Sequence, residues 1–272
     1  MEPKTIFEDK DILVLDKPSG MIVNRSDTTE GEKTVQEWVE NKLKIKNEKS
    51  KIDERLDFYK RAGIVHRLDK ETSGILLVAK NPQSFENLQK QFKERKVKKT
   101  YIALVHGKVA SIQGEINVPV GRLPWNRKRF GVVAGGREAM TKYKVLTLHS
   151  VILSVSEGSH GILRHSPQND MNKEPFTLLE LYPQTGRTHQ IRVHLKYFKH
   201  PIFADPLYAG RKTARNDRKL LPRIFLHASK ISFYHPEGGE LVSFESPPPK
   251  ELQEFLEFLR RQSYSDMGSV QI

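Results

Sequence analysis

Residues 63–80 of the chain read GIVHRLDKETSGILLVAK, a charged segment followed by an apolar run. The run Gly74 to Ala79 has the length and composition of a buried strand. Thr72, Ser73 and Gly74 favour a tight turn immediately before it. The stretch therefore predicts a charged loop that leads through a turn into a strand of the sheet.

Asp69 is the residue of this loop with the clearest chemical potential. It lies between Arg67 and Lys70, and neighbouring cations favour the charged form of a carboxylate. We therefore expect Asp69 to be ionised and available as a nucleophile or a base. From these residues alone the alternative is a surface ion pair, which is the commoner arrangement for an Asp between two cations.

Short apolar runs dominate the rest of the chain, and helical spacing is less frequent. Each run predicts a strand: Ile12 to Leu15, Tyr101 to Val105, Lys142 to Leu146, Thr177 to Leu181, and a pair at Ile224 to Ala228 and Ile231 to Tyr234. Helical spacing predicts four helices: one around Val35 to Leu43, one over Phe85 to Phe92 capped by Ser84, one over Ile191 to Phe198 capped by Thr188, and one around Leu252 to Leu259. Since strands and helices do not alternate regularly, we expect an α+β fold with a mixed or antiparallel sheet and a few flanking helices.

The chain of 272 residues is long enough for one large domain, and we expect a single domain over 1–262. Residues 150–175 are rich in serine and lack periodicity, so they predict a surface insertion between two strands. Residues 263–272 are expected to form a disordered tail.

Composition narrows the function. Forty-six Lys and Arg against 33 Asp and Glu give a net charge of +13, which favours a polyanionic partner, with nucleic acid first and a membrane surface second. The alternative is that the charge serves solubility. The absence of cysteine excludes a disulfide framework, a thiolate zinc site and a cysteine nucleophile. No run has the length of a signal peptide core or a membrane span, so we expect a cytoplasmic protein that does not enter membranes.

A second basic segment, QTGRTHQIRVH at residues 184–194, carries Arg187 and Arg192 near the start of a predicted helix. His189 and His194 suggest a metal site, but no carboxylate or third histidine shares their spacing. We therefore expect no metal.

Four motifs occur in a fixed order along the chain: DILVLDKPSGMIV, HRLDKETSG, KKTYIALVHG and TGRTHQIRVHLKYFKHPIFADPLY. Together they resemble the RluA-type family of RNA pseudouridine synthases. The resemblance implies an isomerase without a cofactor that converts uridine in RNA to pseudouridine. In that reaction the bond from ribose C1′ to N1 breaks, the uracil rotates, and C1′ is joined to C5.

The resemblance also implies roles for individual residues. Asp69, in the HRLD motif, would be the catalytic carboxylate, and Tyr101 would stack on the uracil and offer its hydroxyl. Arg192 would form a salt bridge with Asp69. Arg67 would occupy the space that the flipped base leaves in the RNA, where a planar guanidinium can stack.

Further basic residues are expected to bind RNA phosphates, although each group could equally be a solvated face. They are His66, Lys93, Lys96, Lys98, Arg122, Arg187 and the group Arg127, Lys128 and Arg129, which we expect in a loop. The first motif begins within the opening dozen residues, so the layout resembles the short family members that lack an N-terminal RNA-binding domain. Such members modify tRNA or exposed stem-loops of ribosomal RNA, and we expect a monomer without an obligatory protein partner.

Two other functions compete with this one. The first is a catalytically inactive RNA-binding protein of the same fold, against which the intact Asp69, Tyr101 and Arg192 argue. The second is a glycoside hydrolase that uses Asp69. It would need a second carboxylate about 5 to 10 Å away, and Glu71 on an extended chain points elsewhere.

Overall fold

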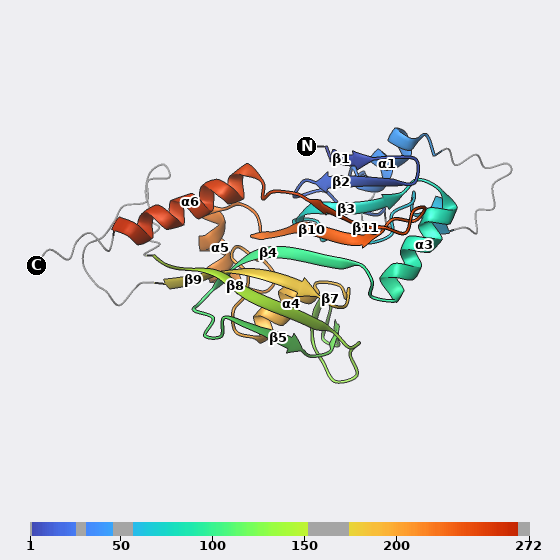
Figure 1. Cartoon of the computed structure of the whole chain (residues 1–272). Helices are drawn as coiled ribbons and strands as arrows, with labels where there is room; N and C mark the ends of the chain where they lie inside the picture. The colour runs from blue at the N-terminus through green and yellow to red at the C-terminus, as the bar shows by residue number, and fades with distance from the viewer. Residues whose placement is uncertain (1, 26–30, 46–56, 152–173, 266–272) are drawn as a thin grey trace, which may run out of the picture. The chain divides into compact units, whose positions relative to one another are not determined.

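The computed structural model describes residues 2–25, 31–45, 57–151 and 174–265 of the chain (Figure 1). The chain forms two compact units, one from 1–101 with 227–247 and one from 102–226 with 248–272. Two strands continue from one unit into the other along the sequence, β4 (Lys98–His106) and β10 (Leu226–Tyr234). We describe each unit by itself, and the single-domain expectation stays a prediction.

The first unit is built on a mixed sheet with the strand order β1-β2-β3-β10, and a further strand, β11, pairs with β10. The pair β2 and β3 is antiparallel, with Leu13 opposite Val78, whereas β3 and β10 are parallel, with Ser73 opposite His227. Every residue of β3 is buried, as expected of a strand covered on both faces. The bounds are β1 Lys4–Glu8, β2 Ile12–Lys17, β3 Ser73–Ala79 and β11 Leu241–Glu245.

Three helices accompany this sheet: α1 (Val35–Leu43), α2 (Asp57–Lys60) and α3 (Pro82–Lys93). The α3 helix packs against β3, and its Phe85 and Leu88 enter an apolar core with Ile75 and Leu77. The predicted cap Ser84 is wrong. Asn81 is the N-cap and its side chain accepts the Ser84 amide at 2.8 Å, because Pro82 begins the helix three residues earlier than expected.

In the second unit the strands follow the order β4-β9-β8-β5, and β6 and β7 form a separate hairpin. The pair β8 and β9 is long and antiparallel, with Tyr143 opposite Leu181. Strand bounds are β5 Gln113–Asn117, β6 Val120–Leu123, β7 Asn126–Val132, β8 Met140–Val151 and β9 Glu174–Pro183. Helix bounds are α4 Gln190–Tyr197, α5 Arg211–Leu220 and α6 Lys250–Ser265. No helix among the described residues is long and apolar enough to cross a membrane.

The α+β class and the mixed sheet are confirmed. The strand pair predicted at 224–228 and 231–234 is instead one strand, β10. The polar residues Ser229 and Lys230 at its centre do not interrupt the strand, because their side chains have partners. Ser229 donates to the Thr100 carbonyl at 3.2 Å, and Lys230 pairs with Glu245 on β11. Most of the predicted insertion, 152–173, lies outside the described residues, and the strands on either side of it pair up to Val151 and Glu174.

Two further local predictions are wrong. Arg127, Lys128 and Arg129 lie in β7 and not in a loop, because the turn of the hairpin is shorter than expected. Thr188 does not cap α4. The N-cap is His189, in a left-handed conformation with φ of 55° and no side-chain cap bond. At the other end of the chain α6 reaches Ser265, three residues beyond the predicted boundary of the tail.

One buried charge ties the first unit together. Lys17, at the end of β2, is fully buried, and its ammonium donates to the carbonyls of Pro18 at 2.9 Å, Met21 at 2.8 Å and Lys70 at 3.0 Å. An ammonium has three protons to donate, so three carbonyls can satisfy it. The contact with Lys70 joins the end of β2 to the loop that carries Asp69.

We expect Lys17→Met to lower the free energy of unfolding by about 3 kcal/mol, because three backbone carbonyls around a fully buried side chain lose their donor. Urea denaturation followed by circular dichroism measures this change. Lys10→Met is the matched control, since the Lys10 side chain is exposed and forms only a surface pair with Glu237. Equal effects of the two substitutions would contradict the anchoring role of Lys17.

Candidate active site

The loop that carries Asp69 is held at both ends by backbone hydrogen bonds. At its start, the Leu77 amide of β3 donates to Nε2 of His66 at 2.9 Å. At its end, the Thr72 amide donates to the Asp69 carbonyl at 3.1 Å and closes a turn. Asp69 is half-buried, and its backbone carbonyl is engaged in this turn. The turn predicted at Thr72, Ser73 and Gly74 lies earlier, at Asp69 to Thr72, because Ser73 and Gly74 already belong to β3.

A second loop, 18–21, binds the same segment from the other side. The Gly20 amide donates to the Lys70 carbonyl at 2.8 Å, and the Ser19 hydroxyl donates to the Glu71 carbonyl at 2.7 Å. Gly20 has φ of 88°, a conformation that a residue with a Cβ adopts only at a cost. The two sequence motifs that contain these loops are therefore one structural element.

Tyr101 is close enough to Asp69 for the carboxylate charge to influence the Tyr101 hydroxyl. Tyr101 lies in β4 with 8% of its surface exposed. Burial raises the pKa of its hydroxyl, and the negative charge of Asp69 raises this pKa further. The hydroxyl therefore stays protonated and can donate a hydrogen bond. The structure brings together these two residues, which the sequence places 32 positions apart.

The two cations that flank Asp69 in the sequence, Arg67 and Lys70, have different surroundings. Arg67 is exposed, as a side chain that contacts RNA must be. Lys70 forms an ion pair with Glu32 at the start of α1. The flanking cation Lys70 is thus bound by another carboxylate, which weakens the alternative that Asp69 serves only in a surface pair with it.

His66 and Lys99 both lie close to the Phe92 ring. The ring centroids of His66 and Phe92 are 5.0 Å apart, and the Lys99 ammonium is 5.9 Å from the Phe92 centroid. Burial lowers the pKa of His66 to about 3, with smaller contributions from the charges of Lys99 and Arg61. Burial also lowers the pKa of Lys99 to about 8. His66 is therefore neutral near pH 7 and adds no positive charge with which to bind a phosphate.

In the second unit Arg192 is fixed by an acid that the sequence analysis did not single out. Its Nε and Nη2 each donate to the Asp205 carboxylate at 2.8 Å, and its guanidinium lies 5.0 Å from the centre of the Tyr208 ring. Asp205 is fully buried and also accepts the amides of Leu207 and Tyr208. The signal was an acid within the apolar segment IFADPLY. A contact of Arg192 with Asp69 would join the two units, and it stays a prediction.

The histidines near Arg192 bond to protein groups. His189 pairs its Nδ1 with the Tyr208 hydroxyl at 2.9 Å. His194 is fully buried, and its nitrogens lie 3.0 Å from the Thr141 hydroxyl and 3.2 Å from the Val118 carbonyl. Burial lowers the pKa of His194, so it stays neutral. Both side chains therefore have structural partners in the positions where a metal would need them.

One group among the described residues has the composition of a metal site. It consists of Asp9, Asp11 and His235, whose ligand atoms lie within 4.8 Å of one another. His235 Nε2 is 2.9 Å from Asp9 Oδ2, and Asp9 Oδ1 accepts the amides of Asp11 and Ile12. The Asp9 carboxylate is therefore already engaged, and the expectation that the protein works without a metal stays a prediction.

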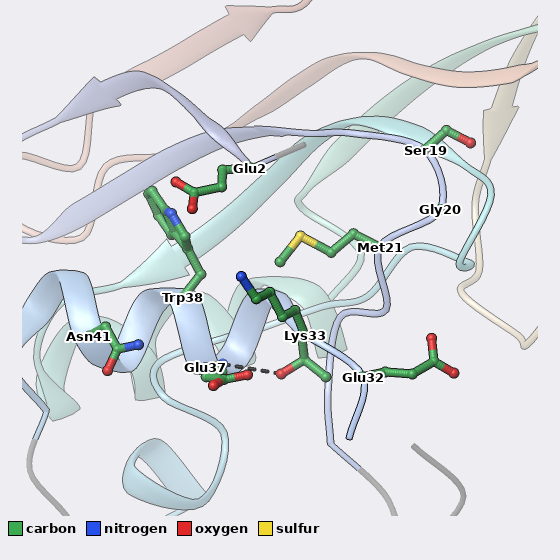
Figure 2. Close-up of a pocket in the computed structure, with 10 residues that line it drawn as sticks. Glu2, Ser19, Gly20, Met21, Glu32, Lys33, Glu37, Trp38 and Asn41 are labelled. Carbon is green, nitrogen blue, oxygen red and sulfur yellow. Dashed lines mark hydrogen bonds between the residues drawn. The ribbon is translucent and has the colours of Figure 1, made fainter. Parts of the chain in front are cut away.

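Figure 2 shows a pocket beside the 18–21 loop, with a volume of about 610 Å³. Ser19, Gly20 and Met21 form one side of it, and residues of α1 form another. Its walls include the carboxylates of Glu2, Glu32 and Glu37, with Lys33 as a cation and Trp38 as an aromatic surface. Three carboxylates repel a phosphate, so this pocket is an unfavourable place for the RNA backbone.

The expected phosphate-binding residues are distributed over both units. In the first unit Lys93, Lys96 and Lys98 are exposed around the end of α3, and Lys96 pairs with Glu94 at 2.7 Å. In the second unit Arg122 is exposed, and Arg187 donates through Nε to the Glu138 carbonyl at 3.0 Å. Arg129 is half-buried in β7, and the side chains of Arg127 and Lys128 lie outside the described ones. Their contacts with RNA stay predictions.

The chain is similar to known RNA pseudouridine synthases. The family model described as RNA pseudouridylate synthase matches residues 11–197. The chain is 36% identical to an uncharacterized RNA pseudouridine synthase of Bacillus subtilis, over 96% of this chain and 74% of the relative. It is also 36% identical to ribosomal large subunit pseudouridine synthase D of Neisseria meningitidis serogroup B, over 96% of this chain and 62% of that protein.

A solved structure shares the fold. Human RNA pseudouridylate synthase domain containing 1 superposes with a TM-score of 0.63 at 24% identity, and 95% of each chain is covered. At this identity the likeness concerns the fold alone.

The lowered pKa of His66 predicts that the stability of the folded chain depends on pH. Its pKa is about 3 in the folded chain against 6.5 as the ordinary value, so the unfolded chain binds this proton more tightly. The contribution to stability is therefore complete above pH 6.5 and is lost as the pH falls toward 3. At pH 5 the loss amounts to about 2 kcal/mol.

We expect His66→Gln to remove this part of the acid sensitivity while its amide oxygen still accepts the Leu77 amide. Urea unfolding at pH 7.5 and at pH 5 measures the difference for each protein. Parallel losses in the wild type and the variant would show that the His66 ring takes up a proton as readily in the folded chain.

Proposed function

Because the chain belongs to the RNA pseudouridylate synthase family, we propose that Asp69 is the carboxylate with which it isomerises uridine to pseudouridine. The electrostatic interaction of Asp69 with the buried Tyr101 hydroxyl carries this proposal. This interaction supports a site in which the Asp69 carboxylate and the protonated Tyr101 hydroxyl both contact one nucleotide. The bonds from the 18–21 loop and from β3 support it further, because they fix the position of the Asp69 backbone.

The proposed chemistry uses only groups of the chain. The bond from C1′ to N1 breaks, the uracil turns within the site and C1′ bonds to C5. The C5 proton is lost to solvent and N1 takes up a proton, so the product is an isomer of the substrate. Asp69 acts beside the ribose and the reacting ring. Tyr101 offers an aromatic face to the flipped base and a hydroxyl proton in place of a lost base pair. The raised pKa of Tyr101 keeps this donor protonated at physiological pH.

We assign to Arg192 the role of holding the Asp69 carboxylate. Asp205 binds Arg192 through Nε and Nη2, which fixes the plane of the guanidinium. We expect the same guanidinium to orient the Asp69 carboxylate. A guanidinium shared by two carboxylates can orient both of them, which a lysine ammonium cannot do with the same geometry.

The proposed substrate is structured RNA, either ribosomal RNA or a tRNA stem-loop. Two relatives named ribosomal large subunit pseudouridine synthase D support ribosomal RNA, and the charge of +13 supports a polyanion. Arg67 fills the place of the flipped base, and the exposed lysines and arginines bind phosphates. A cytoplasmic monomer without an obligatory protein partner completes the proposal.

Asp69→Asn tests the proposed catalytic residue. We expect pseudouridine formation to fall below detection, while RNA affinity and the melting temperature stay close to the wild type, because the volume is kept and only the charged oxygen is lost. Release of tritium from RNA labelled at uridine C5 measures the reaction. Turnover by freshly purified Asp69→Asn would refute the role, and a wild type without activity on RNA from cells lacking the gene would favour the inactive RNA-binding protein.

Arg192→Lys tests the positioning role. We expect a folded protein whose kcat falls by at least 100-fold with a smaller change in KM, because the charge remains and the two-sided geometry is lost. Arg187→Lys is the matched control on the same segment, and it should raise KM for RNA while kcat stays nearly constant. If both variants weakened RNA binding alone, Arg192 would be one more RNA-binding residue.

A further inference from the structure

The hairpin of β6 and β7 ends in an exposed tryptophan. Leu123 pairs with Asn126, so only Pro124 and Trp125 form its turn. Trp125 is 80% exposed, more than any other large hydrophobic side chain among the described residues. Such exposure keeps a large apolar surface in water, which favours a ligand that covers it.

The base of the hairpin is firmly anchored within the second unit. Val120 is buried in an apolar cluster with Ala139, Val193 and Tyr208. The Phe130 amide donates to the Tyr208 hydroxyl at 3.3 Å. Tyr208 also lies under the Arg192 guanidinium. The turn with Trp125 is therefore carried by strands that are fixed next to the proposed positioning residue.

Between Glu115 and Glu138 along the sequence, every charged residue is a cation. Residues 116–137 contain five cations and no acid: Arg122, Arg127, Lys128, Arg129 and Arg137. The Arg122 guanidinium lies 5.3 Å from the centre of the Phe130 ring, so it is held along the hairpin. An exposed indole within a basic segment matches the two surfaces of single-stranded RNA, the flat face of a base and the phosphate beside it.

We propose that Trp125 stacks on an unpaired base of the substrate RNA while the basic residues of the hairpin bind the adjacent phosphates. The proposal rests on RNA being the substrate and extends it to a contact outside the catalytic loop. An unpaired base is required, because bases within a duplex already stack on their neighbours. The hairpin would thereby select single-stranded segments such as the loop of a stem-loop.

The chain has only two tryptophans, so fluorescence can follow this residue directly. In Trp38→Phe the remaining indole is Trp125, and we expect a 12-nucleotide oligouridylate to quench it and to shield it from acrylamide. A 12-base-pair RNA duplex at the same phosphate concentration should quench it far less. Anionic phospholipid vesicles serve as the third probe.

Binding variants separate stacking from charge. We expect Trp125→Ala to raise the Kd for the oligouridylate by about 5- to 100-fold, and Trp125→Phe to recover most of the affinity. Ile112→Ala is the matched control, since Ile112 is 75% exposed in the same unit, and it should not change the Kd. The slope of log affinity against log salt should be unchanged in Trp125→Ala and flatter by about 0.7 in Arg122→Gln.

Two results would overturn the inference. One is an unchanged Kd for Trp125→Ala with the fold intact by circular dichroism. The other is quenching by vesicles with none by the oligouridylate, which would assign the residue to a membrane surface. The tritium-release assay keeps this test apart from the proposed function: an active wild type with unaffected binding by Trp125→Ala refutes stacking alone, whereas an inactive wild type with normal quenching refutes the catalytic proposal alone.

Discussion

The buried ammonium of Lys17 is the interaction on which the candidate active site depends. A charge inside a protein is costly unless hydrogen bonds satisfy it, and here three backbone carbonyls do so. Because one of them belongs to Lys70, the residue after Asp69, movement of the loop that carries Asp69 would deprive the buried ammonium of one of its three acceptors. The half-buried Asp69 is thus part of a backbone segment that buried hydrogen bonds hold in place.

Arg192 and Asp205 apply the same principle in the second unit. A buried ion pair of this kind contributes little net stability, since desolvation offsets the attraction. Its effect is geometric, because Asp205 accepts two guanidinium protons and two backbone amides at once. Both units therefore use buried charges to hold candidate site residues in place, and the apolar cores around them provide the stability.

The positive charges of the chain fall into two classes with different consequences. Lys17 is fully buried and Lys99 is half-buried beside Phe92, so their surroundings limit their access to a phosphate in water, although a pKa of about 8 leaves Lys99 mostly charged at pH 7. Lys93, Lys98 and Arg122 are exposed and can do so. A net charge of +13 therefore overstates the number of cations available for RNA, and the neutral His66 adds none. Contacts other than those between cations and phosphates, such as aromatic stacking, are therefore more important for RNA binding than the net charge suggests.

The sequence by itself determined the family, the α+β class and most of the strands, because these depend on local order: apolar runs, turn residues and motifs in a fixed sequence. It also pointed to Asp69 as the candidate catalytic residue. Helix caps were less predictable, since Asn81 and His189 took the positions expected for Ser84 and Thr188. Only the tertiary structure revealed the partners. Lys17 binds a carbonyl 53 positions away, and nothing in the spacing of residues announces which carbonyls will surround a buried ammonium. Asp205 likewise became a partner of Arg192 only when α4 and the segment after it packed together, because the pairing of buried charges is decided by which groups folding removes from water at the same place.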